Sequence, residues 1–318
     1  MGVSEHQPFA LSGWELGMVS VGLVCAAMLA PLPLYLVALT LFGLPHVLWE
    51  LHWIRQTYRL HIPNGMWLAW WGILGIQASS RLGAWAGWVT VDLTLLVDVL
   101  TLVVLLWVAA GMAWRVGTLR AGLLAGLAVG LGAALLWVVE QGDVLGVLVF
   151  LAIVHNFTPL LLVAHGQYFS VFPARTVLLA LFSLPVLVMI LLLLAGMPAP
   201  ETTGWWMPSE ASWLQQHLPS GFAAALSALV LAQCLHYYSV IRLLPTTLAA
   251  PAGRFWLWGM LAVSLSLTVY FMTDFKAARQ LYAVAAGVHA WLEFPLILLL
   301  LSGLGIGTEQ ADSPKGII

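Results

Sequence analysis

Four histidines lie inside apolar stretches of the chain, where ionisable side chains are rare. They are His46, His155, His236 and His289, in the segments LPHVLWE, AIVHNFT, QCLHYYS and GVHAWLE. An ionisable residue in a membrane-spanning helix is costly, so it usually faces the interior of the bundle and often marks function. Imidazole nitrogen is a ligand of zinc, copper, iron and nickel. These four residues are therefore the candidate ligands of one metal ion.

Two carboxylates accompany the histidines at helical spacing. Glu50 follows His46 by four residues, and Glu293 follows His289 by four residues. Residues at this spacing share one face of a helix. Each glutamate is thus a candidate metal ligand, a catalytic group, or a partner that orients a ligating histidine. The alternative is that each His/Glu pair is a hydrogen bond that holds helices together without a metal.

The other histidines occupy different surroundings. His52 and His165 lie near expected helix ends, and His6, His61 and His217 lie in a tail and in loops, where we expect solvated surface. Further polar or aromatic residues near the four histidines are secondary candidates, for which local hydrogen bonding or packing is the simpler interpretation: Gln233, Tyr237, Tyr238, Asn156, Asp92, Asp98, Trp49 and Trp291.

The composition is that of a polytopic membrane protein. Of 318 residues, 62% are hydrophobic and 8% are charged, against about 25% charged residues in a soluble domain. We therefore predict an all-α bundle of about ten transmembrane helices, at 13–30, 34–54, 66–80, 90–114, 119–139, 144–167, 175–196, 221–244, 255–273 and 281–303. They form one domain, 13–303, between an N-terminal tail, 1–12, and a polar C-terminal tail, 304–318.

The distribution of Lys and Arg predicts the orientation of the chain. With ten spans, eight of these residues fall on one side and three on the other, which predicts that both termini are cytoplasmic. The even-numbered helices then run in parallel, and the four histidines lie within about 9 Å of a common depth. We expect an integral protein of a bacterial inner (plasma) membrane, with the bilayer and a hydrophobic small molecule as partners. The net charge of −2 gives no reason to expect a nucleic acid.

Four segments resemble a known family. GLPHVLWE looks like the GLPHGALD signature of the Brp/Blh-type β-carotene 15,15′-dioxygenases, and the segments around His155, His236 and His289 follow in the order of that family's later histidine segments. The resemblance implies an integral membrane protein with histidine-bound non-haem iron that cleaves carotenoids with dioxygen. Two positions depart from the family, because Val240 stands where it has a second histidine and Leu160 where it has an aspartate.

The leading hypothesis is a membrane non-haem iron (Fe²⁺) oxygenase that acts on a lipid-soluble substrate such as an isoprenoid or carotenoid. The two cysteines, Cys25 and Cys234, lack metal-binding spacing, which favours iron held by nitrogen; zinc and copper are alternatives. Two other functions stay open. One is a b-type membrane cytochrome with axial histidines on haem, and the other is a metal or small-molecule transporter or a metal-assembly factor.

Overall fold

The computed structural model describes residues 13–59, 62–165, 172–196, 215–244 and 253–303, and these ranges contain helices and no strand. The longer helices are α1 (Gly13–Leu29), α2 (Pro31–Tyr58), α3 (Asn64–Trp85), α4 (Val91–Trp114), α5 (Leu119–Glu140), α6 (Val144–His155), α7 (Thr158–His165), α8 (Phe172–Ala195), α10 (Phe222–Tyr238), α11 (Arg254–Thr273) and α12 (Phe275–Ser302). Two short turns flank α10: η2 (Pro219–Gly221) and the π-helical η3 (Ser239–Leu243). The predicted tails lie outside the described residues.

Each of the ten predicted segments is helical, and seven helices are long and apolar enough to cross a membrane. These seven are Pro31–Tyr58, Val91–Trp114, Leu119–Glu140, Thr176–Ala195, Pro219–Leu243, Arg254–Thr273 and Phe275–Ser302. α1 and α6 are apolar but shorter. α3 is longer than the predicted 66–80 and is not among the seven, since its second half carries Gln77, two serines and Arg81. The protein is therefore all-helical with the character of a polytopic membrane protein.

The predicted continuous helix at 144–167 is wrong in one respect. The structure divides it into α6 and α7, with Asn156 and Phe157 between them. Pro159 lacks an N–H that could bond to the carbonyl of His155, four residues earlier. The hydroxyl of Thr158 lies 2.7 Å from that carbonyl oxygen and takes the place of the missing donor. The break therefore leaves His155 as the last residue of α6.

Side-chain caps fix the start of several helices. Asp143 accepts a hydrogen bond from the backbone N–H of Gly146 at the start of α6, and Asp274 accepts one from Ala277 at the start of α12. Such caps satisfy N–H groups that have no partner within the helix. They define the beginning of two of the helices that carry the candidate histidines.

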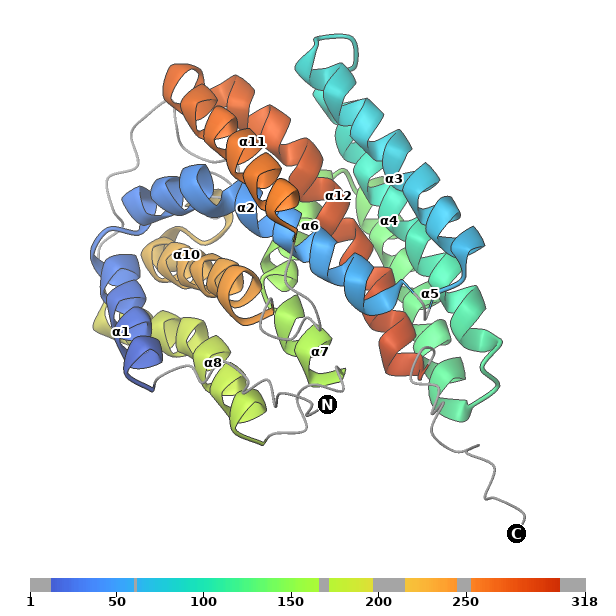
Figure 1. The fold of residues 1–318 in the computed structure, drawn as a ribbon, viewed down its shortest axis with the longest axis horizontal. Helices are drawn as coiled ribbons and strands as arrows, with labels where there is room; N and C mark the ends of the chain where they lie inside the picture. Colours follow the sequence, from blue (N-terminus) through green and yellow to red (C-terminus); the bar gives the residue numbers. More distant parts are fainter. Residues whose placement is uncertain (1–12, 60–61, 166–171, 197–214, 245–252, 304–318) are drawn as a thin grey trace.

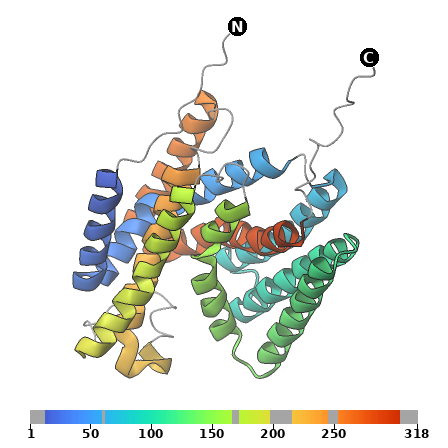
Figure 2. The same cartoon turned by 90° about the horizontal axis from the view of Figure 1, so that it is seen from below.

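Helix α12 occupies the centre of the bundle. It packs against α2, α3, α4, α5, α6, α7 and α11. Figures 1 and 2 show α3, α4 and α5 on one side of α12, while α1, α8 and α10 lie together on the other side, next to α2. Residues from both halves of the chain therefore meet along α12.

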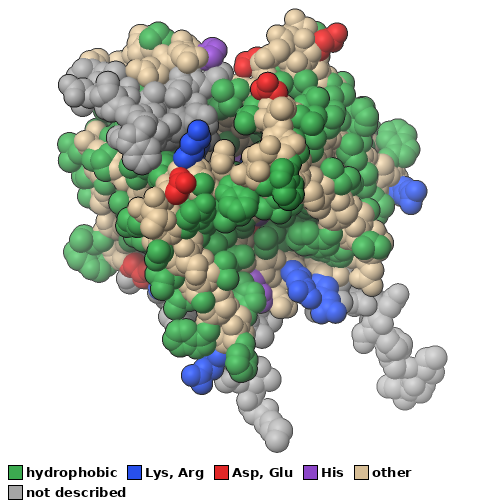
Figure 3. Space-filling view, turned by 90° about the horizontal axis from the view of Figure 1, so that it is seen from above, with side chains coloured by type: hydrophobic (Ala, Val, Ile, Leu, Met, Phe, Trp, Pro, Cys, Tyr) green, Lys and Arg blue, Asp and Glu red, His purple; other side chains and the backbone are tan. Residues whose placement is uncertain are grey.

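The outer surface is largely apolar. Figure 3 shows hydrophobic side chains over most of one face, with few charged groups. Large side chains on the outer helices are strongly exposed, for example Leu127 on α5 at 68% and Leu265 on α11 at 61%. Contiguous exposed apolar surface of this kind is unfavourable in water and suits contact with lipid.

Candidate metal site

The four candidate histidines meet at one buried point. One nitrogen of each ring lies within 4.8 Å of the corresponding nitrogens of the other three. His46 comes from α2, His155 from the end of α6, His236 from α10 and His289 from α12, and none is more than 8% exposed. We call these residues the histidine cluster. A buried cluster of four histidines can hold a metal ion.

Backbone carbonyls fix the tautomers of two of these rings. His46 Nδ1 lies 3.2 Å from the carbonyl oxygen of Phe42, and His289 Nδ1 lies 3.3 Å from that of Ala285. A carbonyl only accepts hydrogen bonds, so each Nδ1 carries the proton and each Nε2 of the neutral ring has a lone pair. The two Nε2 atoms face each other at 3.3 Å. A cation shared between them would offset the repulsion of these lone pairs.

Glu293 orients the third histidine. Its Oε2 lies 2.6 Å from His155 Nδ1 and 2.6 Å from the hydroxyl of Thr158. A carboxylate that accepts from one ring nitrogen directs the other nitrogen toward a metal and raises its basicity. The hydroxyl of Thr158 is therefore close to two acceptors, the backbone carbonyl of His155 and the carboxylate of Glu293. Its single proton can be donated to only one of them at a time.

Glu50 lies beside the cluster without a hydrogen bond. It is fully buried, and its Oε2 is 3.5 Å from His236 Nε2 and 4.0 Å from His289 Nε2. Neither carboxylate oxygen has a hydrogen-bond partner among the described residues, and neither ring nitrogen of His236 has one. Buried polar groups without partners are unfavourable. A cation at the cluster would satisfy both side chains.

The distance between two of the ring nitrogens matches that expected around a first-row transition metal. Imidazole nitrogens bind at about 2.0–2.1 Å, so two neighbouring ligands of a tetrahedral ion lie roughly 3.4 Å apart. The 3.3 Å between the two Nε2 atoms of His46 and His289 agrees with this spacing. With two buried carboxylates next to four imidazoles, the donor set is rich in nitrogen and contains no thiolate; Cys234, the buried cysteine, belongs to a different packing cluster on α10.

The remaining histidines do not join the cluster. His52 is half-buried, and its ring lies 4.4 Å from that of Trp256. Trp49, one of the secondary candidates, packs against the same tryptophan. His217 is exposed. His6 and His61 lie outside the described residues, and so does the side chain of His165.

Among the secondary candidates, Tyr237 stacks directly on a ring of the cluster. Its ring stacks on that of His46, with centroids 3.9 Å apart and an angle of 25° between the planes. Its hydroxyl accepts a hydrogen bond from Gln233 and lies 3.3 Å from the hydroxyl of Tyr282. The sequence analysis missed Tyr282, although it precedes His289 by seven residues and so lies on the same side of α12.

Asp98 makes local hydrogen bonds, as the simpler interpretation of its sequence position predicts. Its carboxylate binds Arg81 through both oxygens, at 2.9 and 2.6 Å, and also accepts a hydrogen bond from Gln77. Trp291 on α12 donates its indole N–H to the backbone carbonyl of Asp98. The side chain of Asp98 therefore ties α3 to α4. Asp92, on the same helix, is exposed.

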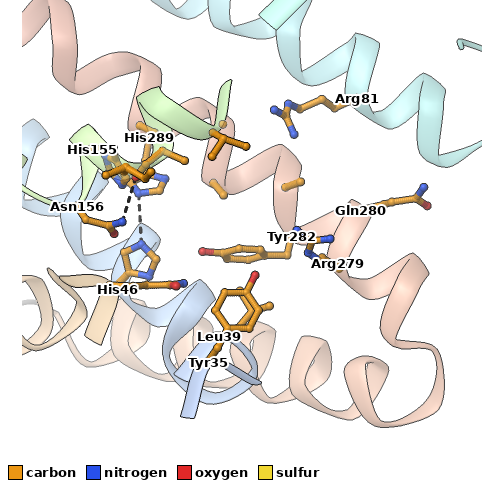
Figure 4. Close-up of a pocket in the computed structure, with 18 of the residues that line it drawn as sticks. Tyr35, Leu39, His46, Arg81, His155, Asn156, Arg279, Gln280, Tyr282 and His289 are labelled. Carbon is orange, nitrogen blue, oxygen red and sulfur yellow. Dashed lines mark hydrogen bonds between the residues drawn. The ribbon is translucent and has the colours of Figure 1, made fainter. Parts of the chain in front are cut away.

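A cavity of about 570 Å³ reaches the histidine cluster. Its walls come mainly from α2, α6, α10 and α12, and they include His46, His155 and His289. In Figure 4, these three rings lie at one end of the cavity, and Arg279 and Gln280 lie at the other end, with Tyr282 between them. The volume is within the usual range for small-molecule sites, about 300–1,000 Å³.

Val240 occupies the position of the second histidine in the resembled family. It is fully buried and lies in the π-helical turn η3, directly after α10. The structure therefore brings together four histidines and provides no fifth one at this position. Comparison of the chain with protein-family models, with curated proteins and with solved structures finds no match.

Proposed function

We propose that the protein is an integral membrane, histidine-ligated iron enzyme, an oxygenase that acts on a lipid-soluble substrate. The observation that carries the proposal is the convergence of four buried imidazoles, three of which line a cavity, with the unpartnered carboxylate of Glu50 beside them. Ferrous iron in a nitrogen-rich site with open coordination positions can activate dioxygen, which is the chemistry such an enzyme needs.

The chain's own residues divide the work. The carbonyls of Phe42 and Ala285 hold His46 and His289 in the tautomer that presents Nε2. The carboxylate of Glu293 holds His155 in the same tautomer by accepting a hydrogen bond from Nδ1 of that ring. Glu50 lies close enough to the ring nitrogens of His236 and His289 to complete the ligand set. The four histidines and both glutamates are buried, so protein surrounds them except where the cavity reaches three of the histidines.

The oxygenase proposal also extends to topology. If α1, α3 and the α6/α7 pair cross the bilayer in addition to the seven apolar helices, the chain crosses ten times and both termini are cytoplasmic. We place it in the inner membrane of a bacterium, and the resemblance to the carotenoid dioxygenases makes an isoprenoid or carotenoid the first substrate to test. In this topology the α6/α7 pair and α8 each cross the bilayer once between the end of α5 and the end of α8. Reporter fusions at these two places should therefore give the same signal, and opposite signals would contradict the topology.

Elemental analysis of the purified full-length protein tests the metal. We expect about one iron per chain in the wild type and a background level in His46→Ala and His236→Ala. His52→Ala is the matched control, because this histidine lies on the same helix as His46 but outside the cluster. Zinc or copper in place of iron would contradict the iron enzyme, and retention of metal by both cluster variants would contradict the site.

Haem is a poorer fit to this geometry. Axial histidines must face each other across a flat macrocycle. In the cluster, four pairs of rings have centroids between 4.6 and 5.3 Å apart, and the rings of His46 and His155 both make edge-to-face contact with that of His289. A Soret band in the purified protein would favour haem and contradict our proposal.

The break between α6 and α7 favours a second candidate function, transport of a metal ion. Discontinuous helices at a binding site are typical of transporters, and here the break directly follows His155. Uptake of ferrous or zinc ions into liposomes containing the purified protein, lost in His155→Ala and unaccompanied by oxygen consumption, would support transport over catalysis.

A further inference from the structure

The cavity has an uneven distribution of charge. Three of its lining residues are basic, namely Arg81, Lys276 and Arg279, and no aspartate or glutamate among the described residues lines it. Arg81 is neutralised by its two bonds to Asp98. Lys276 is exposed and has no carboxylate partner in the described part of the chain. The other two basic residues, Lys276 and Arg279, lie in the first two turns of α12.

The basic end and the histidine cluster lie at opposite ends of the cavity. Lys276 and His289 are both on α12, thirteen residues apart, which corresponds to about 20 Å along the helix. Figure 4 shows Arg279 far from the three labelled histidines, with the ring of Tyr282 between them. A ligand that touches both ends must therefore be elongated.

Much of the wall between the two ends is apolar, although Gln233, Tyr237 and Tyr282 also line it. On α12 the lining includes the small residues Ala283, Ala286 and Ala290. Aliphatic residues of α6 line it as well, namely Leu145, Val149, Ala152 and Ile153. A hydrocarbon chain fits such a wall, whereas a polar chain would leave its groups unpaired.

We propose that the cavity binds an amphiphile with a single anionic headgroup, held at Lys276 and Arg279, whose apolar chain reaches the histidine cluster. This inference rests on the function proposed above, because it names the substrate class of the same site. A carboxylate and a phosphate monoester share the chemistry that Lys276 and Arg279 recognise. The bound chain places its far end, rather than its headgroup, beside the metal ligands.

Binding of a fluorescent polyene lipid tests the headgroup. cis-Parinaric acid, its methyl ester, the corresponding alcohol and the phosphate monoester of that alcohol are titrated against the full-length protein in nanodiscs of phosphatidylcholine. We expect the acid or the phosphate to bind roughly tenfold more tightly than the neutral compounds, the gain typical of hydrogen bonds to a charged group. The stronger of the two anions identifies the headgroup.

Charge-neutralising variants locate the contact. In Lys276→Gln/Arg279→Gln the preference for the anion should disappear, while Arg115→Gln/Arg120→Gln, which removes the same charge outside the cavity lining, should keep it. Ala286→Phe, which fills the cavity between its ends, should weaken all four compounds. Equal binding of acid and ester by the wild type, or an unchanged preference in the Lys276/Arg279 variant, would overturn the inference.

The iron content of the same samples separates this inference from the proposed function. Bound iron without a preference for the anionic probes contradicts the headgroup site alone. A preference for the anionic probes in protein that never carries a metal contradicts the oxygenase and leaves the ligand class of the cavity in place.

Discussion

Asp98 and Glu50 are both fully buried carboxylates in the middle of apolar helices, but their surroundings differ. Both oxygens of Asp98 are bound by Arg81, and Gln77 adds a third hydrogen bond. Neither oxygen of Glu50 has a hydrogen-bond partner among the described residues, and its Oε2 lies 3.5 Å from a ring nitrogen of His236. The carboxylate of Asp98 thus has its hydrogen-bond partners, whereas the carboxylate of Glu50 lacks them within the described part of the chain.

This difference separates a structural polar contact from a binding site. The group formed by Asp98, Arg81 and Gln77 is complete without any additional ligand, so it holds α3 and α4 together. The group around Glu50 is incomplete, because no hydrogen bond joins its oxygens, or the ring nitrogens of His236, to another described residue. Depth in the membrane alone would have ranked both residues equally as functional.

The largest expected effect concerns the complete group. Asp98→Ala leaves the guanidinium of Arg81 without its partner, and removing one member of a buried pair costs about 3–5 kcal/mol in the free energy of unfolding. The exposed Asp92→Ala on the same helix is the control and should change the free energy of unfolding little. Unfolding of the purified variants by denaturant in detergent measures the difference; similar values for the two variants would mean that the pair contributes nothing to stability.

The incomplete group should respond in the opposite way. Glu50→Gln removes an unpartnered buried carboxylate, so we expect metal-free protein to unfold no more readily than the wild type. The affinity for the metal should fall about 10–100-fold, as for other groups that support metal ligands. Competition with a chelator measures the affinity. A variant that is destabilised while its metal affinity is unchanged would place Glu50 in the same category as Asp98.

A methyl group at Gly287 should disturb the complete group from the other side. A Cβ at this position would lie 3.0 Å from Arg81 Nε and 3.1 Å from Gln77 Nε2. We expect Gly287→Ala to lower the free energy of unfolding by about 1–3 kcal/mol, the usual effect of overpacking. Gly75→Ala in α3 has open space around its Cβ and should be neutral or stabilising. Denaturant unfolding of both variants distinguishes crowding from a general loss of glycine.

The smallest expected effect is at Thr158. Thr158→Val keeps the shape of the side chain but removes a hydroxyl that lies 2.7 Å from the carbonyl of His155 and 2.6 Å from Glu293. A lost hydrogen bond of this kind costs about 1 kcal/mol. Thr158→Ser retains the hydroxyl and should behave as the wild type. Equal metal affinity and stability in the two variants would show that the hydroxyl does not support Glu293.

The sequence predicts the helices and the four histidines better than it predicts their partners. Long apolar runs locate ten helical segments, and the charge cost of an ionisable residue in such a run singles out His46 and His236. The partner of Asp98 could not be predicted in this way, because it depends on how α3 and α4 are rotated about their axes. Arg81 itself was expected outside the spans, but α3 continues to Trp85 and carries it toward α4.

The break after His155 was likewise beyond what hydropathy can indicate. The run at 144–167 is apolar throughout the region of Pro159, so its composition favours a single helix. Prolines also lie within α2 and α12, as Pro45 and Pro295, where the helix continues. What differs at Pro159 is the neighbouring Thr158, whose hydroxyl reaches the carbonyl of His155 and the carboxylate of Glu293. That contact depends on tertiary structure.

The division of α6 from α7 bears on how an ion enters and leaves so enclosed a place. Three of the cluster histidines belong to α2, α10 and α12, which have 28, 17 and 28 residues, whereas α6 has 12. A short helix that ends at its histidine can shift as a unit on a local, submillisecond to millisecond scale without separation of the long helices. The exchange rate of the ion would then depend on movement of α6, and the affinity would depend on the histidines of α2, α10 and α12.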